Sequence, residues 1–332
     1  MVDQGSPEQE SPEQEANRAR PRATLRDYRM PLRTYRRVAI VALLLLCAIV
    51  VTGVSVRLTG SGLGCSAWPN CESGDFIKIG DPNQAIEQLN RLFTGLVSLG
   101  VAAAVLGALR LRERRRDLTW LSLGLVAGVI AQIVLWGITV LVDLHPAAVA
   151  GHFFLSMVLV VDATLLVWRA GQPGGAVRPA VAEVQVRANW VAMAAGAIVL
   201  SVTGPLVTGS GPHAGDGSAR RFSVAIPDAA RIHSLSAWVF CALVVGVLVM
   251  LYRSGAPGDV LRRGQVLLAV IVAQGAVGYF QYNLGIPAWL VLLHVVGATS
   301  IAIAGTWFTA GLFTPASPRR TAASVGRSSV SS

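Results

Sequence analysis

Eight long apolar segments divide this sequence of 332 residues. Each is long enough, at about 1.5 Å of rise per residue, to cross the roughly 30 Å hydrocarbon core of a bilayer as a helix. The segments cover approximately residues 38–58, 86–109, 118–142, 147–168, 188–208, 229–252, 264–283 and 288–313. A chain with 53% hydrophobic and 14% charged residues is too apolar to form a single soluble domain. The sequence therefore predicts an all-α membrane protein with eight transmembrane helices.

The arginines are concentrated on one side of the predicted spans. Eight lie between Arg18 and Arg37 and five between Arg110 and Arg116, and smaller groups follow the fourth, sixth and eighth spans. Because positive side chains favour cytoplasmic loops, both termini are predicted to lie in the cytoplasm of a multi-pass plasma membrane protein. The net charge of +10 thus indicates topology and contact with anionic lipid headgroups. No nucleic acid partner is expected, because neither aromatic residues nor a binding motif accompany the charge.

The apolar segments predict five regions. Residues 1–37 begin with the repeat SPEQESPEQE, have almost nothing to bury and are expected to form a disordered basic cytoplasmic arm. Two four-helix bundles are expected at 38–170 and 188–313, joined by a cytoplasmic linker at 171–187. A tail rich in Ser and Arg, 314–332, is also expected to be disordered.

The two predicted bundles carry the same sequence landmarks. The segments AQIVLWGITVLVDLHPAAVAGH and AQGAVGYFQYNLGIPAWLVLLH each place a glutamine twenty residues before a histidine, and the elements VTG and TGSG also occur in both halves. The glutamines, Gln132 and Gln274, are 142 residues apart, as are the histidines, His152 and His294. A repeat of this length indicates two homologous halves. Because each half has an even number of spans, the halves are predicted to be parallel and related by a pseudo-two-fold axis along the membrane normal.

Three histidines lie in apolar helices near the outer face, where an ionisable side chain is costly and by default marks a functional site. His233 and His294 are predicted to bind one haem iron from both sides, as the axial ligands of an electron-transferring haem b. The alternative is two interfacial histidines bonded to backbone or lipid. The position that matches His233 in the first half is Asn90. His152 is therefore predicted to be a single ligand to a second haem, or else a core histidine preserved from the duplication.

Glu87 precedes Asn90 by three residues and so shares a helix face with it. It is predicted to be an acid or base held over a porphyrin edge. The alternative is an interfacial carboxylate neutralised by Arg91. The matching residue in the second half is Ala230, so the two haem pockets are predicted to be chemically unequal, one reactive and one for electron transfer.

Other charged residues carry weaker signals. Arg57, Arg91 and Arg231 lie at the outer ends of spans one, two and six, where guanidinium groups suit haem propionates. Snorkelling to phosphate headgroups explains them nearly as well. Asp162 lies in the middle of span four, and both a structural hydrogen bond and a proton path remain open for it.

Cys65 and Cys71 enclose SAWPN in the first outer loop. Two nearby cysteines outside the cytoplasm predict a disulfide, and a redox-active pair is the alternative. His145 and His213 fall in outer loops, and no role is predicted for them.

The ordered combination of motifs resembles the haem A synthase family. The motifs are RLTGSGLGCSAWPNC after the first span, AIEQLNR at the entry to the second, GHFFLSM and LLHVVGA at the repeated histidines, and IHSLSAW at the entry to the sixth. The likeness covers about residues 38–313. It implies two four-helix bundles, a haem b in the C-terminal half, and oxidation of the C8 methyl group of haem O to a formyl group by successive hydroxylations, which gives haem A.

The resemblance also implies site residues. Glu87 matches the essential acidic residue, His233 and His294 the ligands of the cofactor haem b, and Cys65 and Cys71 the outer-loop pair. The substrate haem O pocket would contain His152, Asn90, Arg91 and Arg57. The family's usual histidine is Asn90 here, which speaks against binding of haem O by two histidines. Asn90 would instead bond an iron-bound water or oxygen species, or leave the iron five-coordinate through His152.

As a hypothesis, haem O enters from the bilayer with its farnesyl tail in lipid, and the haem sites face the extracytoplasmic side. Membrane lipids, haem O synthase and cytochrome oxidase assembly factors are the expected partners, and a homo-oligomer is compatible with the sequence. Two other functions remain open. A di-haem b-type cytochrome in quinol-linked electron transfer would hold two permanent haems, and a non-enzymatic haem carrier or assembly chaperone would leave haem unchanged.

Overall fold

The computed structural model describes residues 29–65, 67–72, 74, 77 and 79–316. In these residues, eight helices are long and apolar enough to cross a membrane. They are α2 (Leu32–Leu58), α3 (Pro82–Leu109), α4 (Arg116–Leu141), α5 (Pro146–Ala170), α6 (Glu183–Ser210), α7 (Ile226–Arg253), α8 (Gly258–Asn283) and α9 (Ala288–Gly311). Two short strands, β1 (Val177–Pro179) and β2 (Phe313–Pro315), pair in antiparallel fashion. The prediction of an all-α membrane protein with eight spans is confirmed.

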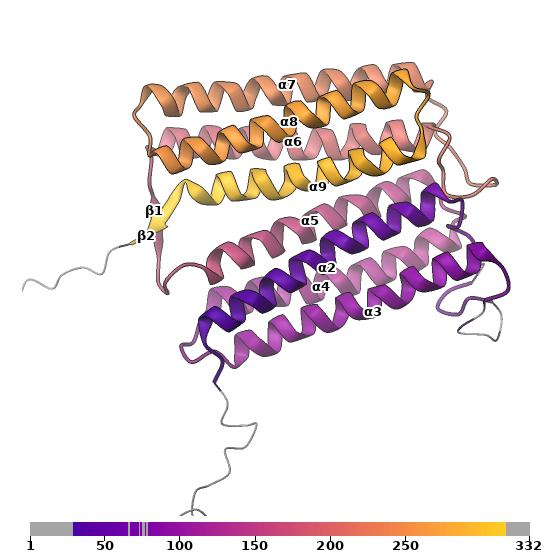
Figure 1. Ribbon diagram of the computed structural model, residues 1–332, viewed down its shortest axis with the longest axis horizontal. Coiled ribbons are helices and arrows are strands. Elements are labelled where there is room, and N and C mark those ends of the chain that lie inside the picture. The colour runs from indigo at the N-terminus through magenta and orange to yellow at the C-terminus, as the bar shows by residue number, and fades with distance from the viewer. Residues whose placement is uncertain (1–28, 66, 73, 75–76, 78, 317–332) are drawn as a thin grey trace, which may run out of the picture.

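The helices form two groups, α2–α5 and α6–α9, which lie side by side in Figure 1. Within each group every helix packs against the next, and the last packs back against the first, as in a closed four-helix bundle. Between the groups, α5 contacts α9, α5 contacts α6, and α2 contacts α9. If the two bundles are exchanged, the α5–α6 contact becomes the α2–α9 contact and the reverse, whereas the α5–α9 contact is unchanged. A pseudo-two-fold axis, as predicted, requires this pattern.

Each bundle has its own apolar core. The core of the first includes Tyr35, Leu125 and Leu166, and that of the second includes Leu267 and Phe308, all fully buried. Glycines let helices approach closely where a large side chain must fit. For example, the ring of Phe240 on α7 packs against the bare face of Gly196 on α6.

The ordered structure extends into three regions for which no helix or strand is predicted. Helix α2 begins at Leu32, inside the predicted disordered arm of residues 1–37, and α6 begins at Glu183, inside the predicted linker. Strand β2 includes the first residues of the predicted tail. Apolar runs miss these segments because the end of a transmembrane helix can be polar, with arginine stems packed along the membrane surface. Residues 1–28 of the arm and 317–332 of the tail lie outside the described residues.

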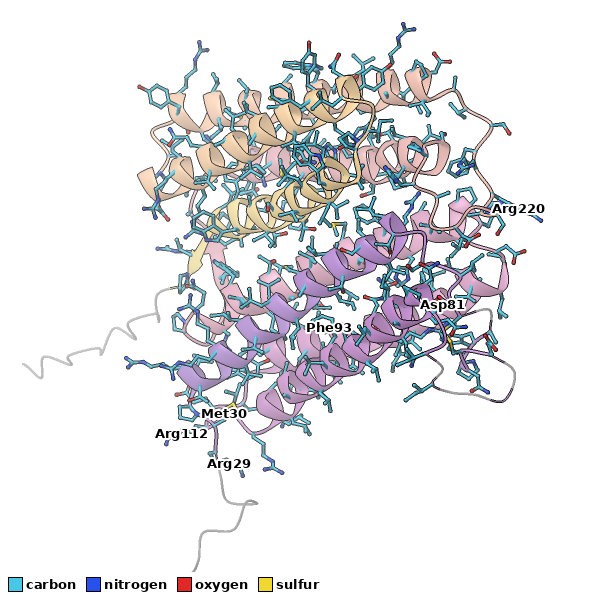
Figure 2. All side chains as sticks on the ribbon, turned by 45° about the vertical axis from the view of Figure 1, so that its right-hand side comes forward. Arg29, Met30, Asp81, Phe93, Arg112 and Arg220 are labelled. Atoms are coloured by element: carbon cyan, nitrogen blue, oxygen red, sulfur yellow. A yellow bond between two sulfur atoms is a disulfide. The ribbon has the colours of Figure 1, made fainter. Side chains whose placement is uncertain are left out.

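The two ends of the first bundle differ in charge. Figure 2 shows Arg29 and Arg112 at one end and Asp81 towards the other. At the arginine-rich end, Asp117 Oδ2 lies 2.8 Å from Arg115 Nη2 and 2.6 Å from Arg169 Nη2. This network ties the start of α4 to the end of α5. The histidines of the predicted site lie near the opposite end.

Candidate haem-binding cavity

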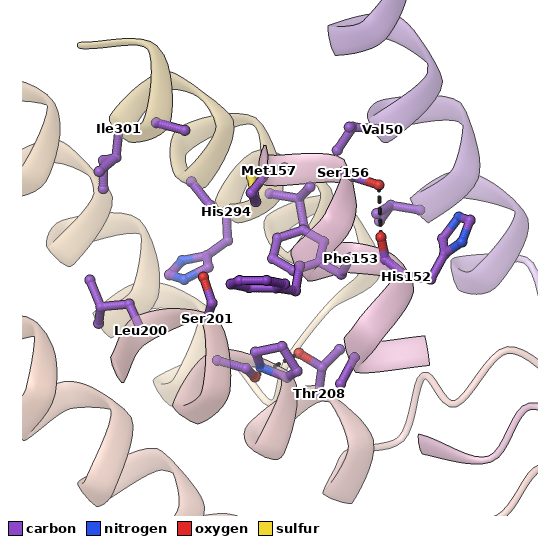
Figure 3. A pocket seen from close by; sticks show the side chains of 18 of the residues that line it. Val50, His152, Phe153, Ser156, Met157, Leu200, Ser201, Thr208, His294 and Ile301 are labelled. Atoms are coloured by element: carbon purple, nitrogen blue, oxygen red, sulfur yellow. Dashed lines mark hydrogen bonds between the residues drawn. The ribbon is translucent and has the colours of Figure 1, made fainter. Parts of the chain in front are cut away.

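A cavity of about 1950 Å³ extends through both bundles and is lined by residues from all eight helices. Ordinary ligand pockets measure about 300–1,000 Å³, so this one has room for two large ligands. His152, His233 and His294, the three histidines predicted as ligands, all line it. In Figure 3, His294 and His152 appear on either side of Phe153.

His233 on α7 and His294 on α9 face each other across the second bundle. Their ring centroids are 6.2 Å apart and the ring planes are inclined at 65°. Because a metal–imidazole bond is about 2 Å long and the ring centre lies about 1 Å beyond the nitrogen, two imidazoles on opposite sides of one metal have centroids about 6 Å apart. The pair therefore has the spacing that axial ligation of one haem iron requires.

A threonine fixes the tautomer of His233. Thr203 Oγ1 lies 3.0 Å from His233 Nδ1 and donates its single proton to the carbonyl of Val199, at 2.9 Å. The hydroxyl must then accept a hydrogen bond from Nδ1–H, which leaves the Nε2 lone pair available. Orientation of this kind is what second-sphere partners of metal-binding histidines provide.

Two glycines make room for the imidazoles. A Cβ atom at Gly204 on α6 would lie 3.4 Å from His233 Cε1, and one at Gly278 on α8 would lie 3.1 Å from His294 Cε1. Each ring therefore rests against a helix face that carries no side chain. The spacing, the tautomer and this cradle together fit a haem bound between His233 and His294.

The repeated glutamines anchor the histidine-bearing helices. Gln132 Nε2 donates to the carbonyl of His152 at 3.1 Å, and Gln274 Nε2 donates to that of His294 at 2.7 Å. The same contact in both bundles explains the constant spacing of twenty residues. We infer that these glutamines set the height of each histidine relative to the preceding helix.

His152 on α5 packs against a tryptophan, whereas His294 packs against a glycine. Its ring centroid is 5.4 Å from that of Trp136 on α4, whereas the repeat places Gly278 at the matching position in the second bundle. His152 Nδ1 is buried and has no hydrogen-bond partner among the described residues. The first bundle therefore offers one cavity-lining imidazole.

Asn90 on α3 lines the cavity and is bonded to α2. Thr52 Oγ1 lies 2.8 Å from Asn90 Oδ1. Thr52 belongs to the first VTG element and Thr203 to the second. The threonine–asparagine contact of the first bundle thus repeats the threonine–histidine contact of the second.

Glu87 is fully buried on α3 but does not line the cavity. Its Oε2 accepts the backbone N–H of Cys65 at 2.8 Å, and its Oε1 lies 2.7 Å from Arg91 Nη2. Arg91, which does line the cavity, also donates to three carbonyls of the first outer loop, those of Ala67, Pro69 and Asn70. Glu87 thus lies behind Arg91 relative to the cavity, and its place over a porphyrin edge stays a prediction.

The first outer loop is closed by the predicted disulfide between Cys65 and Cys71. Both cysteines are fully buried. Glu87 and Arg91 hold the backbone of this ring, so the disulfide and the acidic residue belong to one structural unit.

Arg57, Arg91 and Arg231 differ in their surroundings. Arg57 donates to the carbonyls of His213 and Thr208, at 2.6 Å and 2.8 Å, and so ties α2 to the second bundle. The side chain of Arg231 is 83% exposed, and its nearest carboxylate, on Asp228, is 3.9 Å away. Arg57 reaches the cavity, and two of its five guanidinium N–H groups are used within the protein.

Some contributors to the site carry no predicted role. His213, in the loop between α6 and α7, lines the cavity, and its Nε2 lies 2.9 Å from the carbonyl of Ile286. Thr52 and Thr203 are visible in the sequence only as part of the repeated VTG element, and that repetition is the signal that could have found them. Asp162 lies outside the cavity lining, with its carboxylate against the bare face of Gly124 on α4.

Comparison with known proteins adds to this geometry. No protein-family profile matches the sequence. A curated haem A synthase from Listeria monocytogenes is 24% identical over 280 residues, which are 77% of this chain and 88% of that protein. Those from Listeria welshimeri and Bacillus pumilus are each 28% identical over shorter stretches, 39% and 40% of this chain and 43% of each relative. These similarities support the haem A synthase family.

The similarity to haem A synthases agrees with the general features of the chain. It supports an oxidoreductase of haem biosynthesis that resides in a membrane, which agrees with the eight spans. The names of the relatives imply that haem is involved. Within this frame, the His233–His294 pair and the single His152 make the two bundles chemically different.

Proposed function

We propose that this protein converts haem O to haem A by oxidising the C8 methyl group to a formyl group through successive hydroxylations. The observation that carries the proposal is the His233–His294 pair, with its spacing of 6.2 Å between ring centroids in a cavity shared with His152. The similarity to haem A synthases supplies the reaction. A function that needs only one kind of haem site would leave the two unequal pockets unexplained.

In the proposal, the second bundle holds haem b. His233 and His294 would be its axial ligands, and Thr203, Gly204 and Gly278 keep their imidazoles in place. A haem with two axial imidazoles supplies one-electron redox chemistry and has no open coordination position for substrate. This bundle would therefore carry electrons for the reaction without touching the reacting carbon.

The first bundle would take haem O as substrate. His152 would anchor it, and the apolar wall formed in part by Trp136 and Phe153 would exclude water from the porphyrin. The farnesyl tail would remain in the lipid. The size of the cavity, about 1950 Å³, is sufficient for both the substrate and the cofactor.

Glu87 would act through Arg91 in this arrangement. The carboxylate fixes the guanidinium group, and the guanidinium group lines the cavity beside Asn90. Arg91 is the cationic residue of α3 that lines the cavity. Its orientation would determine how a substrate propionate or a proton is received. In this structure we therefore assign Glu87 a positioning role for the substrate side.

The proposal is tested by producing the chain in cells that make haem O but not haem A. Haem is extracted from their membranes, and the formyl-bearing product is identified by mass. Haem A is expected only when the chain is present. Two retained haems without a formyl product would indicate a b-type cytochrome, and a single unchanged haem would indicate a carrier.

The expected membrane orientation and partners belong to the same proposal. The arginine-rich end of the bundles would face the cytoplasm and the histidines the opposite side. Haem O synthase and cytochrome oxidase assembly factors would be partners only through the shared substrate and product.

A further inference from the structure

In each bundle, a threonine of the VTG element contacts the side chain at the proposed iron position. Thr203 on α6 contacts His233 Nδ1 at 3.0 Å, and Thr52 on α2 contacts Asn90 Oδ1 at 2.8 Å. His233 lies near the start of α7 and Asn90 near the start of α3, the helix that follows the threonine in each case. Asn90 therefore occupies the structural position of an axial imidazole.

An amide at this position is a poor replacement for the imidazole. The carbonyl oxygen of Asn90 accepts a hydrogen bond from Thr52 with one of its two lone pairs, and iron favours an imidazole nitrogen over a neutral carbonyl oxygen. The remaining amide nitrogen carries two protons and is a donor without a free lone pair, so it does not bind iron. What α3 presents to the cavity at this position is a side chain with two N–H donors.

The space for an imidazole is nevertheless preserved. In the second bundle, a Cβ atom at Gly204 would lie 3.4 Å from the His233 ring. In the first bundle, a Cβ atom at the matching Gly53 would have no other atom within 4 Å. Asn90 is shorter than histidine and leaves the face of Gly53 open.

We propose that the first bundle binds its haem through His152 alone, with the Asn90 amide and an open space beside Gly53 on the other side. A haem held by one imidazole dissociates more readily than one held by two, because a single ligand bond must break. The first site is thus an exchange site for substrate and product, and the second retains its haem. This inference rests on the proposed haem function and specifies how its substrate side differs.

The test uses the purified full-length chain, haem b as the probe, and the variant N90H, for which the open face of Gly53 has room. Haem is added in excess, unbound haem is removed, and haem per chain is counted alongside absorption and paramagnetic resonance spectra. The wild type is expected to retain about one haem with two axial imidazoles, and N90H about two. N90L, similar in size to asparagine but without a ligand, should match the wild type.

A second arm uses free imidazole before unbound haem is removed. In the wild type, imidazole should enter the open side and convert the haem of the first bundle to the spectrum of a two-imidazole complex. In N90H, which already has that ligand, imidazole should cause no further change.

Two haems with paired imidazoles in the wild type would overturn the inference. So would an N90H protein that keeps the His233–His294 signal and gains no second one. If N90H loses both signals it has misfolded, and the imidazole arm then decides, since no spectral change in the wild type also overturns the inference. Failure of the proposed function is distinct, because it appears as absence of formyl haem in cells whatever these spectra show.

Discussion

Glu87 and Arg91 form an ion pair one helical turn apart on α3, with Arg91 Nη2 2.7 Å from Glu87 Oε1. The side chain of Glu87 is only 1% exposed, and its second oxygen accepts the N–H of Cys65. A carboxylate this deep is stable only with its partners, because an unpaired buried charge is costly. The pair therefore links the stability of the loop that contains Cys65 to the orientation of Arg91 in the cavity.

Removing the cation should destabilise the protein strongly. R91L leaves the Glu87 carboxylate buried with the Cys65 amide, and loss of one partner of a buried ion pair costs about 3–5 kcal/mol. The melting temperature of the purified protein should fall accordingly. R231L serves as the control, because Arg231 is exposed and its ion pair with Asp228 is long, at 3.9 Å. Equal melting temperatures for R91L and R231L would contradict a structural role for the pair.

The conservative change E87Q should separate folding from activity. Glutamine keeps the shape of Glu87 and can still accept the Cys65 N–H, so the chain should fold and retain the haem between His233 and His294. The uncharged side chain holds Arg91 less firmly. Haem A yield in cells should fall by at least about tenfold, because a positioned group that transfers a proton contributes about 10²–10⁴-fold to a rate. An undiminished yield, measured by chromatography of extracted haem, would remove Glu87 from the mechanism.

Opening the disulfide should loosen the same unit. The double change C65S and C71S removes a ring of short sequence separation, six residues, which corresponds to about 2–3 kcal/mol in the chain-entropy description. A lower melting temperature and reduced haem A yield are expected together, because the Cys65 amide is a partner of Glu87. The same change at a free cysteine, C47S, is the control. Lower stability with full haem A yield would show that the ring does not position Glu87.

The sequence is sufficient to predict the features that depend on patterns along the chain. Hydropathy predicts the eight spans because each must match the thickness of a bilayer, and the spacing of Gln132 and His152 repeats in Gln274 and His294 because each pair makes the same interhelical hydrogen bond. The pairing of His233 with His294 also follows from residue types and repeat positions alone. Their closeness across the bundle agrees with that pairing.

What the sequence could not predict depends on the folding of loops. The environment of Glu87 is set by the Cys65 backbone, and that of Arg57 by the carbonyls of Thr208 and His213, some 150 residues away. Backbone groups have no signature in the residue types, so the carbonyl partners of Arg57 and Arg91 could not be predicted. Contact of these arginines with propionates stays a prediction. The start of α2 at Leu32 is missed for a related reason, since its first turns carry arginines and no apolar pattern.

The hydroxyl of Thr203 should control how tightly the second bundle holds its haem. T203V keeps the side-chain volume but removes the acceptor of the His233 Nδ1 proton. Loss of such a partner typically lowers metal affinity by about 10–100-fold. The rate of haem transfer to an excess of a haem-binding acceptor should rise in T203V and stay near the wild-type value in T203S. Equal rates in T203V and the wild type would show that the tautomer of His233 is fixed in another way.

Two glycines of α8 provide a test of the imidazole cradle with an internal control. A Cβ atom at Gly278 would lie 3.1 Å from His294 Cε1, whereas one at Gly275, less than one turn earlier, would have no other atom within 4 Å. Both Gly→Ala changes gain the same helix propensity, about 1 kcal/mol, so any difference between them comes from the ring. G275A should match or exceed the wild type in both melting temperature and haem content. G278A should push His294 out of line with His233, and purified protein should lose a measurable fraction of its haem. If G278A and G275A retain equal haem, His294 is not held by the face of Gly278, and the fit of the second bundle to a haem with two axial imidazoles loses one of its supports.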